Sequence, residues 1–439
     1  MPSMFNGRGL LKLIQWSGVT VFLVTLLAGW WLPDKSELWV RSLFWGLFWP
    51  VLTVTLLLLS GPLFCAFCPL GVLGRSISRF GLGRRLPQRL NHMGWSLATL
   101  LGSYWLVNAA VSGGYGKLPL TATLIFFSTF LLLMLLMSIY YRDAPFCRSL
   151  CPFAVIAQGC SNTSSLTVKL SQDCQNCRSV ECSRLCPQRI SLPLLNDSRQ
   201  HQSCNLCLAC FSQCSSLSLG YSTHRPQVHR PTIYAWAYIA LIAMVTIQTQ
   251  LQHRWDRSSM RELLPWNTLA EYLSPSITLP WLNVSGLLLT LFALLITATI
   301  VWSSAVAASI FIKDRKQNWL PDMLSINIPL LLCLLLSHGL MMFMSRGISN
   351  LVNGLAQLGG NQWQFTGLAR DNDIMPWFSI LLWLGVGWSL LLAWKWAKPH
   401  SRSALSHIGL WGIGSSLIWL FLALRFGGIM LDTAAVRCH

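Results

Sequence analysis

The chain has 439 residues, of which 53% are hydrophobic and only 10% are charged. A soluble domain carries about 25% charged residues, so this composition excludes an ordinary soluble protein and predicts an integral membrane protein. A net charge of +18 is also typical of nucleic-acid-binding proteins, but no aromatic-rich RNA motif or recognition helix accompanies the basic residues. We therefore expect no nucleic acid partner.

Runs of about 20 apolar residues predict transmembrane helices. The sequence contains nine such runs, near 14–32, 42–64, 94–112, 119–140, 232–250, 281–303, 323–344, 376–394 and 408–428. The first run is longer than the core of a signal peptide, and no A-x-A cleavage site follows it, so we interpret it as a helix that stays in the membrane. The expected fold class is an all-α polytopic membrane protein.

Basic residues are concentrated in alternate loops. If the N-terminus is inside, the cytoplasmic segments are 1–13, 65–93, 141–231, 304–322 and 395–407. They hold 22 of the 32 Lys and Arg residues and 6 of the 14 acidic residues, which leaves a net charge of +16 there and +2 on the other side. This asymmetry follows the positive-inside rule. It predicts a multi-pass protein of the bacterial inner (cytoplasmic) membrane, with a cytoplasmic N-terminus and a periplasmic C-terminus.

The chain divides by composition into three blocks. Residues 1–140 hold four predicted helices, residues 141–231 form a polar, cysteine-rich cytoplasmic insert, and residues 232–439 hold five more helices. The insert has too few apolar residues to build a large core. A bound metal centre is therefore expected to supply much of its folding energy.

Eight cysteines of the insert fall into two runs. The first is Cys174-x2-Cys177-x4-Cys182-x3-Cys186-Pro187, and the second is Cys204-x2-Cys207-x2-Cys210-x3-Cys214. The second run has the spacing of bacterial ferredoxins, and the first has it with two extra residues in its middle gap. In that pattern three cysteines of a run hold one cluster and the fourth reaches across to the other. The sequence therefore predicts a ferredoxin-like insert with two [4Fe-4S] clusters, one held by Cys174, Cys177, Cys182 and Cys214, the other by Cys204, Cys207, Cys210 and Cys186.

Two alternatives remain for these eight cysteines. Two four-cysteine zinc sites would need the same number of thiolates, although such sites usually use separated C-x2-C pairs. Disulfides need an oxidising compartment, whereas the charge distribution places the insert in the cytoplasm. Iron–sulfur clusters are the interpretation that the spacing favours.

Two further cysteine pairs stand at predicted membrane edges, and each is followed by proline. They are Cys65-x2-Cys68-Pro69, after the second predicted helix, and Cys147-x3-Cys151-Pro152, after the fourth. Proline stops a helix and turns the chain, so the two elbows could bring four sulfurs together in an additional metal or redox site. The alternative is four reduced structural cysteines, because free cysteine is commonly buried.

Nearby basic residues are expected to favour thiolates at this membrane-edge site. They are Arg75, Arg142 and Arg148. Three other cysteines are isolated in the sequence, and we interpret them as non-ligands: Cys160, Cys333 and Cys438.

Ionisable residues inside a membrane are candidates for function. His338, Arg346 and Arg425 lie toward the periplasmic ends of predicted helices and could form a quinol site. The alternative is that the arginines extend to water and that the histidine only packs. A b-type haem often needs two histidines on facing helices, and only His338 is clearly within a predicted span. Haem is therefore not expected.

Together these motifs resemble the NapH/NosR type of membrane ferredoxin over roughly residues 40–220. In that family two C-x3-C-P motifs at the membrane edge flank a helix pair, and a cytoplasmic double [4Fe-4S] domain follows. The Cys147 motif matches, the Cys65 motif is one residue shorter, and Ser215 stands where a proline would follow Cys214. The resemblance implies electron transfer between the quinol pool or a redox partner and a periplasmic reductase or its maturation system.

The expected function is that of an electron carrier in a membrane complex, with no substrate chemistry of its own or only quinol oxidation. One alternative is a metal-handling or thiol-redox maturation factor that works through the membrane-edge cysteines. Another is a transporter with a ferredoxin insert as redox sensor, which the few intramembrane charges and the lack of an inverted repeat disfavour. The loops at 251–280 and 345–375 are the expected docking surfaces for a periplasmic partner.

Overall fold

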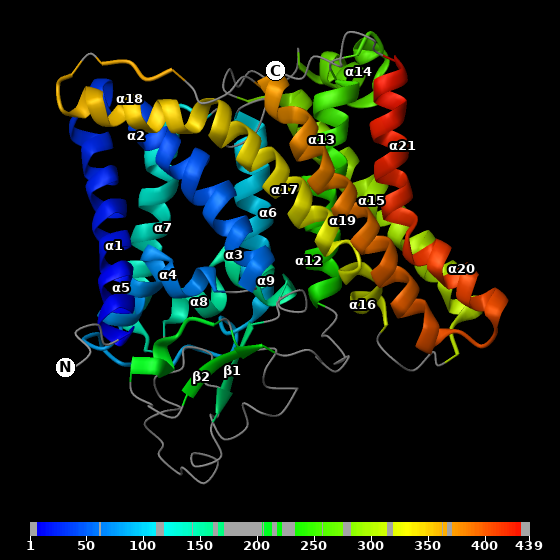
Figure 1. Ribbon diagram of the computed structural model, residues 1–439, viewed down its shortest axis with the longest axis horizontal. Helices are drawn as coiled ribbons and strands as arrows, with labels where there is room; N and C mark the ends of the chain where they lie inside the picture. Colours follow the sequence, from blue (N-terminus) through cyan, green and yellow to red (C-terminus); the bar gives the residue numbers. More distant parts are fainter. Residues whose placement is uncertain are drawn as a thin grey trace. The chain divides into compact units, whose positions relative to one another are not determined.

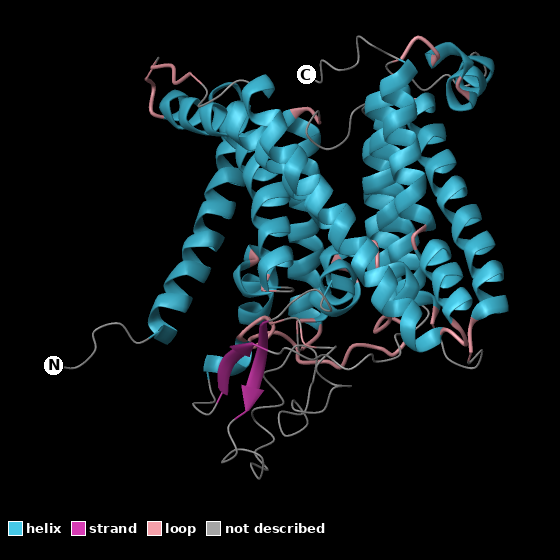
Figure 2. Ribbon diagram, turned by 45° about the vertical axis from the view of Figure 1, so that its right-hand side comes forward, coloured by secondary structure: helices cyan, strands magenta, loops and turns pink. Residues whose placement is uncertain are grey.

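The computed structural model describes residues 7–60, 63–110, 118–142, 144–160, 166–170, 204, 206–212, 217–221, 233–256, 258–274, 282–313, 319–361, 363–366 and 371–431. Within these ranges the chain is mostly helical (Figure 2). Two strands, β1 (Leu166–Leu170) and β2 (Leu217–Tyr221), form one antiparallel pair.

The described residues contain seven helices that are long and apolar enough to cross a membrane, or eight if the bent pair Ala404–Gly414 and Ser416–Met430 is one span. The chain is therefore a multi-pass membrane protein, as predicted. The run predicted at 94–112 forms α6 (Met93–Ala110), which is not among these spans. Its serine, glycine, tryptophan and asparagine residues dilute its apolar character.

The chain forms two compact units, and the units do not follow the three blocks of the sequence. Unit 1 comprises Met1–Leu100, Pro119–Val228 and Arg346–Leu368, and unit 2 comprises Leu101–Leu118, His229–Ser345 and Ala369–His439. The cysteine-rich insert thus belongs to the same unit as the first helices.

Unit 1 contains the membrane helices of the N-terminal region and the strands of the insert (Figure 1). Its elements are α1 (Gly7–Trp31), α2 (Pro33–Arg41), η1 (Ser42–Leu52), α3 (Thr53–Ser60), α4 (Phe64–Phe67), α5 (Pro69–Ile77), the first part of α6, α7 (Leu120–Tyr140), α8 (Pro145–Ser149), α9 (Pro152–Gly159), β1, η6 (Ala209–Ser212), β2 and α18 (Ile348–Leu358). The second membrane span begins at Pro33, nine residues before the predicted start, because α2 continues directly into the π-helical η1.

Aromatic rings fill the core of unit 1. Phe44 stacks on Phe127 with ring centroids 4.1 Å apart, and Phe22 meets both rings edge-on. The indole Nε1 of Trp45 donates to Thr123 Oγ1 over 2.9 Å, which satisfies two polar groups between η1 and α7. These contacts hold α1, η1 and α7 together above the cysteine motifs.

The region predicted as a loop at 345–375 contains the amphipathic helix α18. Its apolar residues Ile348, Leu351, Val352 and Leu355 follow the spacing of one helix face. This helix packs against α2 at Gly354, where an added Cβ would lie 2.5 Å from the backbone nitrogen of Trp39. The close approach of the two backbones explains the glycine.

Replacing Gly354 with alanine is expected to lower the free energy of unfolding by about 1–3 kcal/mol, because the methyl group meets backbone that cannot move aside. Helix propensity alone would favour alanine by about 1 kcal/mol. A lower free energy of unfolding would therefore report the clash with the backbone of Trp39. Thermal unfolding in detergent, followed by circular dichroism, gives the shift. Gly359→Ala is the control, since a Cβ there makes only ordinary contacts at 3.6 Å, and an equal shift in both variants would contradict the prediction.

Unit 2 contains the remaining spans (Figure 1). Its elements are the second part of α6, α12 (Ile233–Leu241), η7 (Ile242–Ile247), α13 (Gln248–Gln250), η8 (Leu251–Trp255), η9 (Arg261–Leu263), α14 (Pro265–Leu273), α15 (Val284–Phe311), α16 (Leu320–Ser325), α17 (Ile328–Met342), α19 (Asp371–His400), α20 (Ala404–Gly414) and α21 (Ser416–Leu431). A further turn, η11 (Phe343–Gly347), passes from unit 2 to unit 1.

Several predicted span ends in unit 2 differ from the structure. The span predicted at 232–250 continues to Trp255, because the π-helical η8 extends the helix after Gln250. The region predicted as a loop at 251–280 contains this turn and also α14. Apolar runs find the middle of a span well, whereas a polar helical end such as Gln250–His253 carries no apolar signal.

Candidate functional site

The structure describes three of the eight cysteines of the insert. Cys204, Cys207 and Cys210 lie at or beside η6, whereas the other five lie outside the described residues: Cys174, Cys177, Cys182, Cys186 and Cys214. Cys438 also lies outside them. The structure therefore describes the surroundings of the predicted ligands only at the second run.

The backbone around Cys207 adopts an uncommon conformation. Leu206 and Leu208 have φ values of 44° and 54°, which place both in the left-handed region. Non-glycine residues seldom adopt this conformation, and it costs a bulky side chain about 1–2 kcal/mol. Cys207 itself is only 7% exposed. Where left-handed residues alternate with right-handed ones, successive N–H groups turn toward one point, a nest that binds anionic groups such as iron–sulfur clusters. Leu206 and Leu208 supply the left-handed positions of such a pattern.

A small hydrophobic core supports this loop. Val168 of β1, Leu206 and Leu217 of β2 are buried together, and Cys204, Cys210 and other partly buried residues pack against them: Leu63, Leu166 and Phe211. Leu63 directly precedes α4, which carries the first membrane-edge cysteine. The core therefore joins the cysteine loop of the insert to the edge of the membrane helices.

The strand pair brings the two ends of the cysteine-rich segment together. Leu170 and Leu217 are partners in the β1–β2 register. In the sequence, Cys174 follows Leu170 by four residues, and Cys214 precedes Leu217 by three. The strand pair therefore holds the beginning and the end of the cysteine-rich segment next to each other.

The membrane-edge cysteines stand at helix breaks, as their prolines predict. Helix α4 ends at Phe67, Cys68 is extended with a ψ of 119°, and α5 begins at Pro69. Helix α8 ends at Ser149, and α9 begins at Pro152, directly after Cys151. Each motif is a short helix, a cysteine elbow and a second short helix.

Side chains from neighbouring helices fix both elbows. Gln15 Nε2 of α1 donates to the carbonyl of Ala66 over 2.8 Å, between the first two cysteines. The Ser96 hydroxyl of α6 donates to the carbonyl of Cys151. Arg75 Nη1 also reaches the carbonyl of Cys65 over 3.4 Å. The cysteine positions are therefore set by the surrounding membrane helices.

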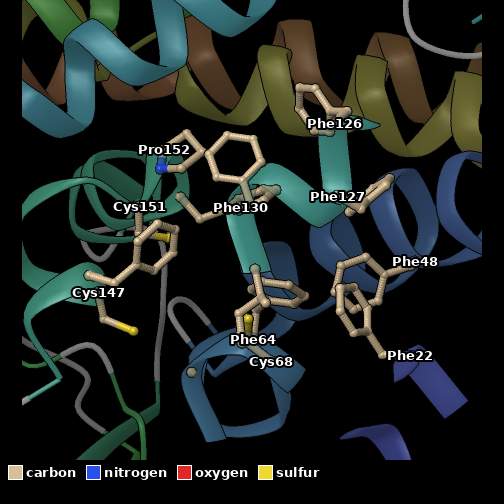
Figure 3. A pocket seen from close by; sticks show the side chains of 14 residues that line it. Phe22, Phe48, Phe64, Cys68, Phe126, Phe127, Phe130, Cys147, Cys151 and Pro152 are labelled. Atoms are coloured by element: carbon tan, nitrogen blue, oxygen red, sulfur yellow. The ribbon is translucent and has the colours of Figure 1, made fainter. Parts of the chain in front are cut away.

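The structure brings all four membrane-edge cysteines to one cavity. Cys65, Cys68, Cys147 and Cys151 line a space of about 20 Å³ together with Arg75. Such a volume holds about one water molecule or a single ion. An adjoining cavity of about 50 Å³ has 14 lining residues, of which eight are phenylalanines. Figure 3 shows Cys147 and Cys151 beside each other in this second cavity, with Cys68 and Phe64 across from them.

Burial controls the protonation of these thiols. It raises the pKa of Cys65, Cys68 and Cys151, and it raises the pKa of Cys147 to about 12. Arg75 lowers the pKa of Cys68 and Cys147, but loss of hydration outweighs it. Arg75 therefore acts in the predicted direction on two of the four thiols, but burial has the larger effect on their pKa. Ligation would require each thiol to release its proton.

Cys207 of the insert lies close to this site. It acts electrostatically on both Cys65 and Cys147, and each effect raises the pKa of the membrane-edge thiol. Cys207 and the membrane-edge cysteines therefore form one neighbourhood within unit 1. No pattern in the sequence predicts this proximity.

The four thiols are not closely gathered around a single ion. In the described part of the chain, no group of three His, Cys, Asp or Glu side chains has the arrangement of a metal site. A tetrahedral zinc ion with Zn–S bonds of about 2.3 Å would hold its sulfurs about 3.8 Å apart. A bound metal would therefore need the elbows to close around it.

The predicted quinol residues fall into different units. His338 in α17 and Arg425 in α21 belong to unit 2, and Arg346 belongs to unit 1. Instead, the structure places His338 beside His253 of η8, with ring centroids 5.9 Å apart. The membrane span that contains η8 extends to Trp255 and therefore includes His253. The expectation that only His338 is clearly within a span is wrong.

Other predicted residues have structural environments. Arg148 Nη2 donates to Asn91 Oδ1 over 2.9 Å. Cys160 is buried at the end of α9, and Cys333 is buried in α17, where an added Cβ at Gly385 of α19 would lie only 2.7 Å from the Cβ of Cys333. Packing accounts for the position of Cys333.

Comparison with known proteins gives no further identification: no family model, no curated protein and no solved structure matches the chain.

Proposed function

We propose that this protein is a membrane-bound iron–sulfur electron carrier of the NapH/NosR type. Its insert would hold two [4Fe-4S] clusters and pass electrons between the quinol pool or a redox partner and a periplasmic reductase or its maturation system. The observation that carries the proposal is the left-handed backbone on both sides of buried Cys207. It stands within a run of four cysteines with ferredoxin spacing.

The residues present fit such a cluster. Cys204, Cys207 and Cys210 supply three thiolates from one loop, and the N–H groups turned by Leu206 and Leu208 can donate hydrogen bonds to cluster sulfur. Val168, Leu206 and Leu217 exclude water from that side of the loop. When bound, a [4Fe-4S] cluster accepts or donates one electron at a time, at a potential tuned by hydrogen bonds and solvent exposure.

The strand register supports the exchange of the fourth cysteines between runs. Leu170 pairs with Leu217. In the sequence, Cys174 and Cys214 are each within four residues of this pair. This supports the assignment of Cys174, Cys177, Cys182 and Cys214 to one cluster. Cys186 would then complete the set of Cys204, Cys207 and Cys210.

Metal analysis of the whole protein tests the proposal. Protein purified without oxygen should contain about eight iron and about eight acid-labile sulfide per chain, and reduction should give EPR signals of two [4Fe-4S] clusters. Zinc in place of iron and sulfide would overturn the proposal. Tags in the insert that react only from the periplasm would overturn the proposed orientation.

The backbone at Leu208 gives a sharper test of the nest. Leu208→Ile keeps side-chain volume and apolar character, but branching at Cβ makes a left-handed backbone more costly. We expect Leu208→Ile to lose its iron–sulfur absorbance severalfold faster than wild type under a chelator. Leu208→Gly should lose it no faster than Leu208→Ile, since glycine adopts positive φ freely. The control is Leu219→Ile in β2, an exposed strand position. Equal rates for Leu208→Ile and wild type would contradict the prediction.

One observation favours a second candidate function. Four cysteines from two elbows line a single cavity, which also suits a metal-handling or thiol-redox maturation factor. In that case the membrane-edge thiols would bind or reduce copper or iron for a partner enzyme, since thiolates prefer soft metals such as Cu(I). The two functions differ in what replacement of Cys147 does to the partner enzyme: it would lose its reduction in the first case and its metal in the second.

A further inference from the structure

Two histidines meet inside the membrane-spanning part of unit 2. His253 lies in the span Ile233–Trp255 and His338 in the span Leu320–Leu358. Their ring centroids are 5.9 Å apart, and their planes are tilted by 38°. Ionisable side chains at membrane depth are costly and are usually retained for function. A pair from two helices is a stronger signal than His338 alone.

The packing of α17 directs His338 away from α19. Leu330, Cys333 and Ser337 face α19: the N–H of Leu330 donates to Ser389 Oγ over 3.1 Å, the Cβ of Cys333 lies beside Gly385, and the Ser337 hydroxyl donates to the carbonyl of Phe378 over 2.8 Å. His338 is the next residue, turned by about 100° around the helix, and it is exposed. Its ring therefore lies outside the α17–α19 contact.

The packing of η8 fixes His253 in the same way. Trp255 Nε1 donates to the carbonyl of Leu424 over 2.9 Å, and Arg254 lies against Gly428, where an added Cβ would be 2.6 Å from the Arg254 Cβ. The glycine lets η8 approach α21 closely. Because Arg254 and Trp255 are held by α21, the π-helical turn sets the direction of His253, and such turns frequently occur at functional sites.

We propose that His253 and His338 are the two axial ligands of a b-type haem in unit 2. A metal bonded to two imidazole nitrogens at about 2.0 Å on opposite sides holds those nitrogens about 4 Å apart, and the ring centres about 6 Å apart. The observed 5.9 Å fits this arrangement. Haem iron takes only two ligands from the protein in such a site, whereas a zinc or copper site of nitrogen ligands usually needs three or more.

Two arginines stand in the sequence beside His253 and on the helix packed against η8, and their charge would favour haem over a bare metal ion. Arg254 follows His253 in the chain, and Arg425 follows Leu424, whose carbonyl accepts from Trp255. Arginine repels a free cation but pairs well with carboxylates, and haem carries two propionates. The rest of the macrocycle is apolar, which suits a site between membrane helices. The chain has no C-x-x-C-H motif, so the haem would be bound without a covalent link.

This inference goes beyond the proposed function and stands whether or not the insert holds iron–sulfur clusters. When bound, haem supplies a one-electron redox group whose potential depends on its axial ligands. In the orientation proposed from charge, both histidines lie toward the periplasmic ends of their helices. Such a group would lie toward the periplasmic side of the membrane, which clusters in a cytoplasmic insert could not reach.

The visible spectrum of the full-length protein tests the inference. Cells supplied with a haem precursor should yield protein with a Soret band and, after dithionite reduction, split α and β bands. Acid acetone should extract about one haem per chain. His253→Ala and His338→Ala should each lower the haem content at least about tenfold, since each removes an axial ligand.

Two further variants protect the test against misfolding. His253→Met and His338→Met should retain haem with shifted bands and a higher potential, because methionine is also an axial ligand. His407→Ala is the matched control: His407 is a histidine of the same unit whose ring lies 4.0 Å from that of Trp394, and its loss should leave the spectrum unchanged. The iron–sulfur content of each variant is measured separately by EPR and reports on the insert.

Three results would overturn the inference. The first is wild-type protein that shows no Soret band even after incubation with haemin. The second is haem that remains in both alanine variants. The third is zinc or copper that binds at one ion per chain in place of haem and is lost in the same two variants.

Discussion

A Cys207→Ser protein should lose the EPR signal of one [4Fe-4S] cluster and about half of its iron, while the signal of the other cluster remains. Cys207 is almost fully buried between two residues with left-handed backbone. The serine hydroxyl is a harder and far less acidic ligand than a thiol, and it leaves one iron without its thiolate. EPR of dithionite-reduced protein and iron analysis on the same sample measure both effects.

The control for this experiment is Cys333→Ala, which removes a buried cysteine packed in α17 of unit 2. It should keep both signals and all iron. The proposed exchange between runs adds a second comparison, because Cys214→Ser should affect the cluster that Cys207→Ser leaves intact. If both variants abolish the same signal, the assignment of ligands to clusters is wrong. If Cys207→Ser retains all its iron, Cys207 is not a ligand.

The membrane-edge site shows what sequence patterns can predict and where they stop. Proline after Cys68 and after Cys151 predicts the two helix breaks, because proline has no N–H to continue a helix, and both breaks are present. Equal membrane depth of the two motifs predicts that the cysteines could meet, and they line one cavity. The surrounding phenylalanines come from six separate elements, and no local pattern predicts that they converge.

The pKa of the thiols could not be predicted from nearby charges. Arg75 acts in the expected direction on Cys147, but the cost of burying a thiolate depends on how many atoms surround it in the folded chain. That quantity is a property of packing. The same holds for Cys207, whose effect on Cys65 depends on how the β1–β2 pair sits against Leu63.

His253 was missed for a different reason. Hydropathy marks a span by its apolar middle, and the polar sequence from Gln248 to Arg254 ends that signal one turn early. The structure continues the helix through η8, and Gln248 and Gln250 are buried there. A membrane span that ends in buried glutamines is recognisable only after its neighbours are known. The second histidine, and with it the haem inference, therefore depends on tertiary structure.

Cys147→Ser should leave both EPR signals of the insert in place but lower electron transfer to a partner, or the metal content of the membrane-edge site, by at least about tenfold. Cys147 shares its cavity with Cys65, Cys68 and Cys151, and a site of four sulfurs loses a ligand when one is replaced. The insert keeps its own eight cysteines, so its clusters should survive. EPR, metal analysis and reduction of the partner are measured on the same membranes.

The matched control is Cys160→Ala, a buried cysteine at the end of α9 in the same unit. It lies outside the set that lines the membrane-edge cavity, so it should leave all three measurements unchanged. If Cys147→Ser stops reduction of the partner while the clusters stay reducible, the electron-transfer proposal is supported, and the membrane-edge site is one step of the transfer. If it instead removes copper or iron from the partner enzyme while reduction continues, the maturation function is the better account. If Cys147→Ser and Cys160→Ala behave alike, the four sulfurs have only a structural role, because a ligand set must be sensitive to its own members and indifferent to a neighbour outside it.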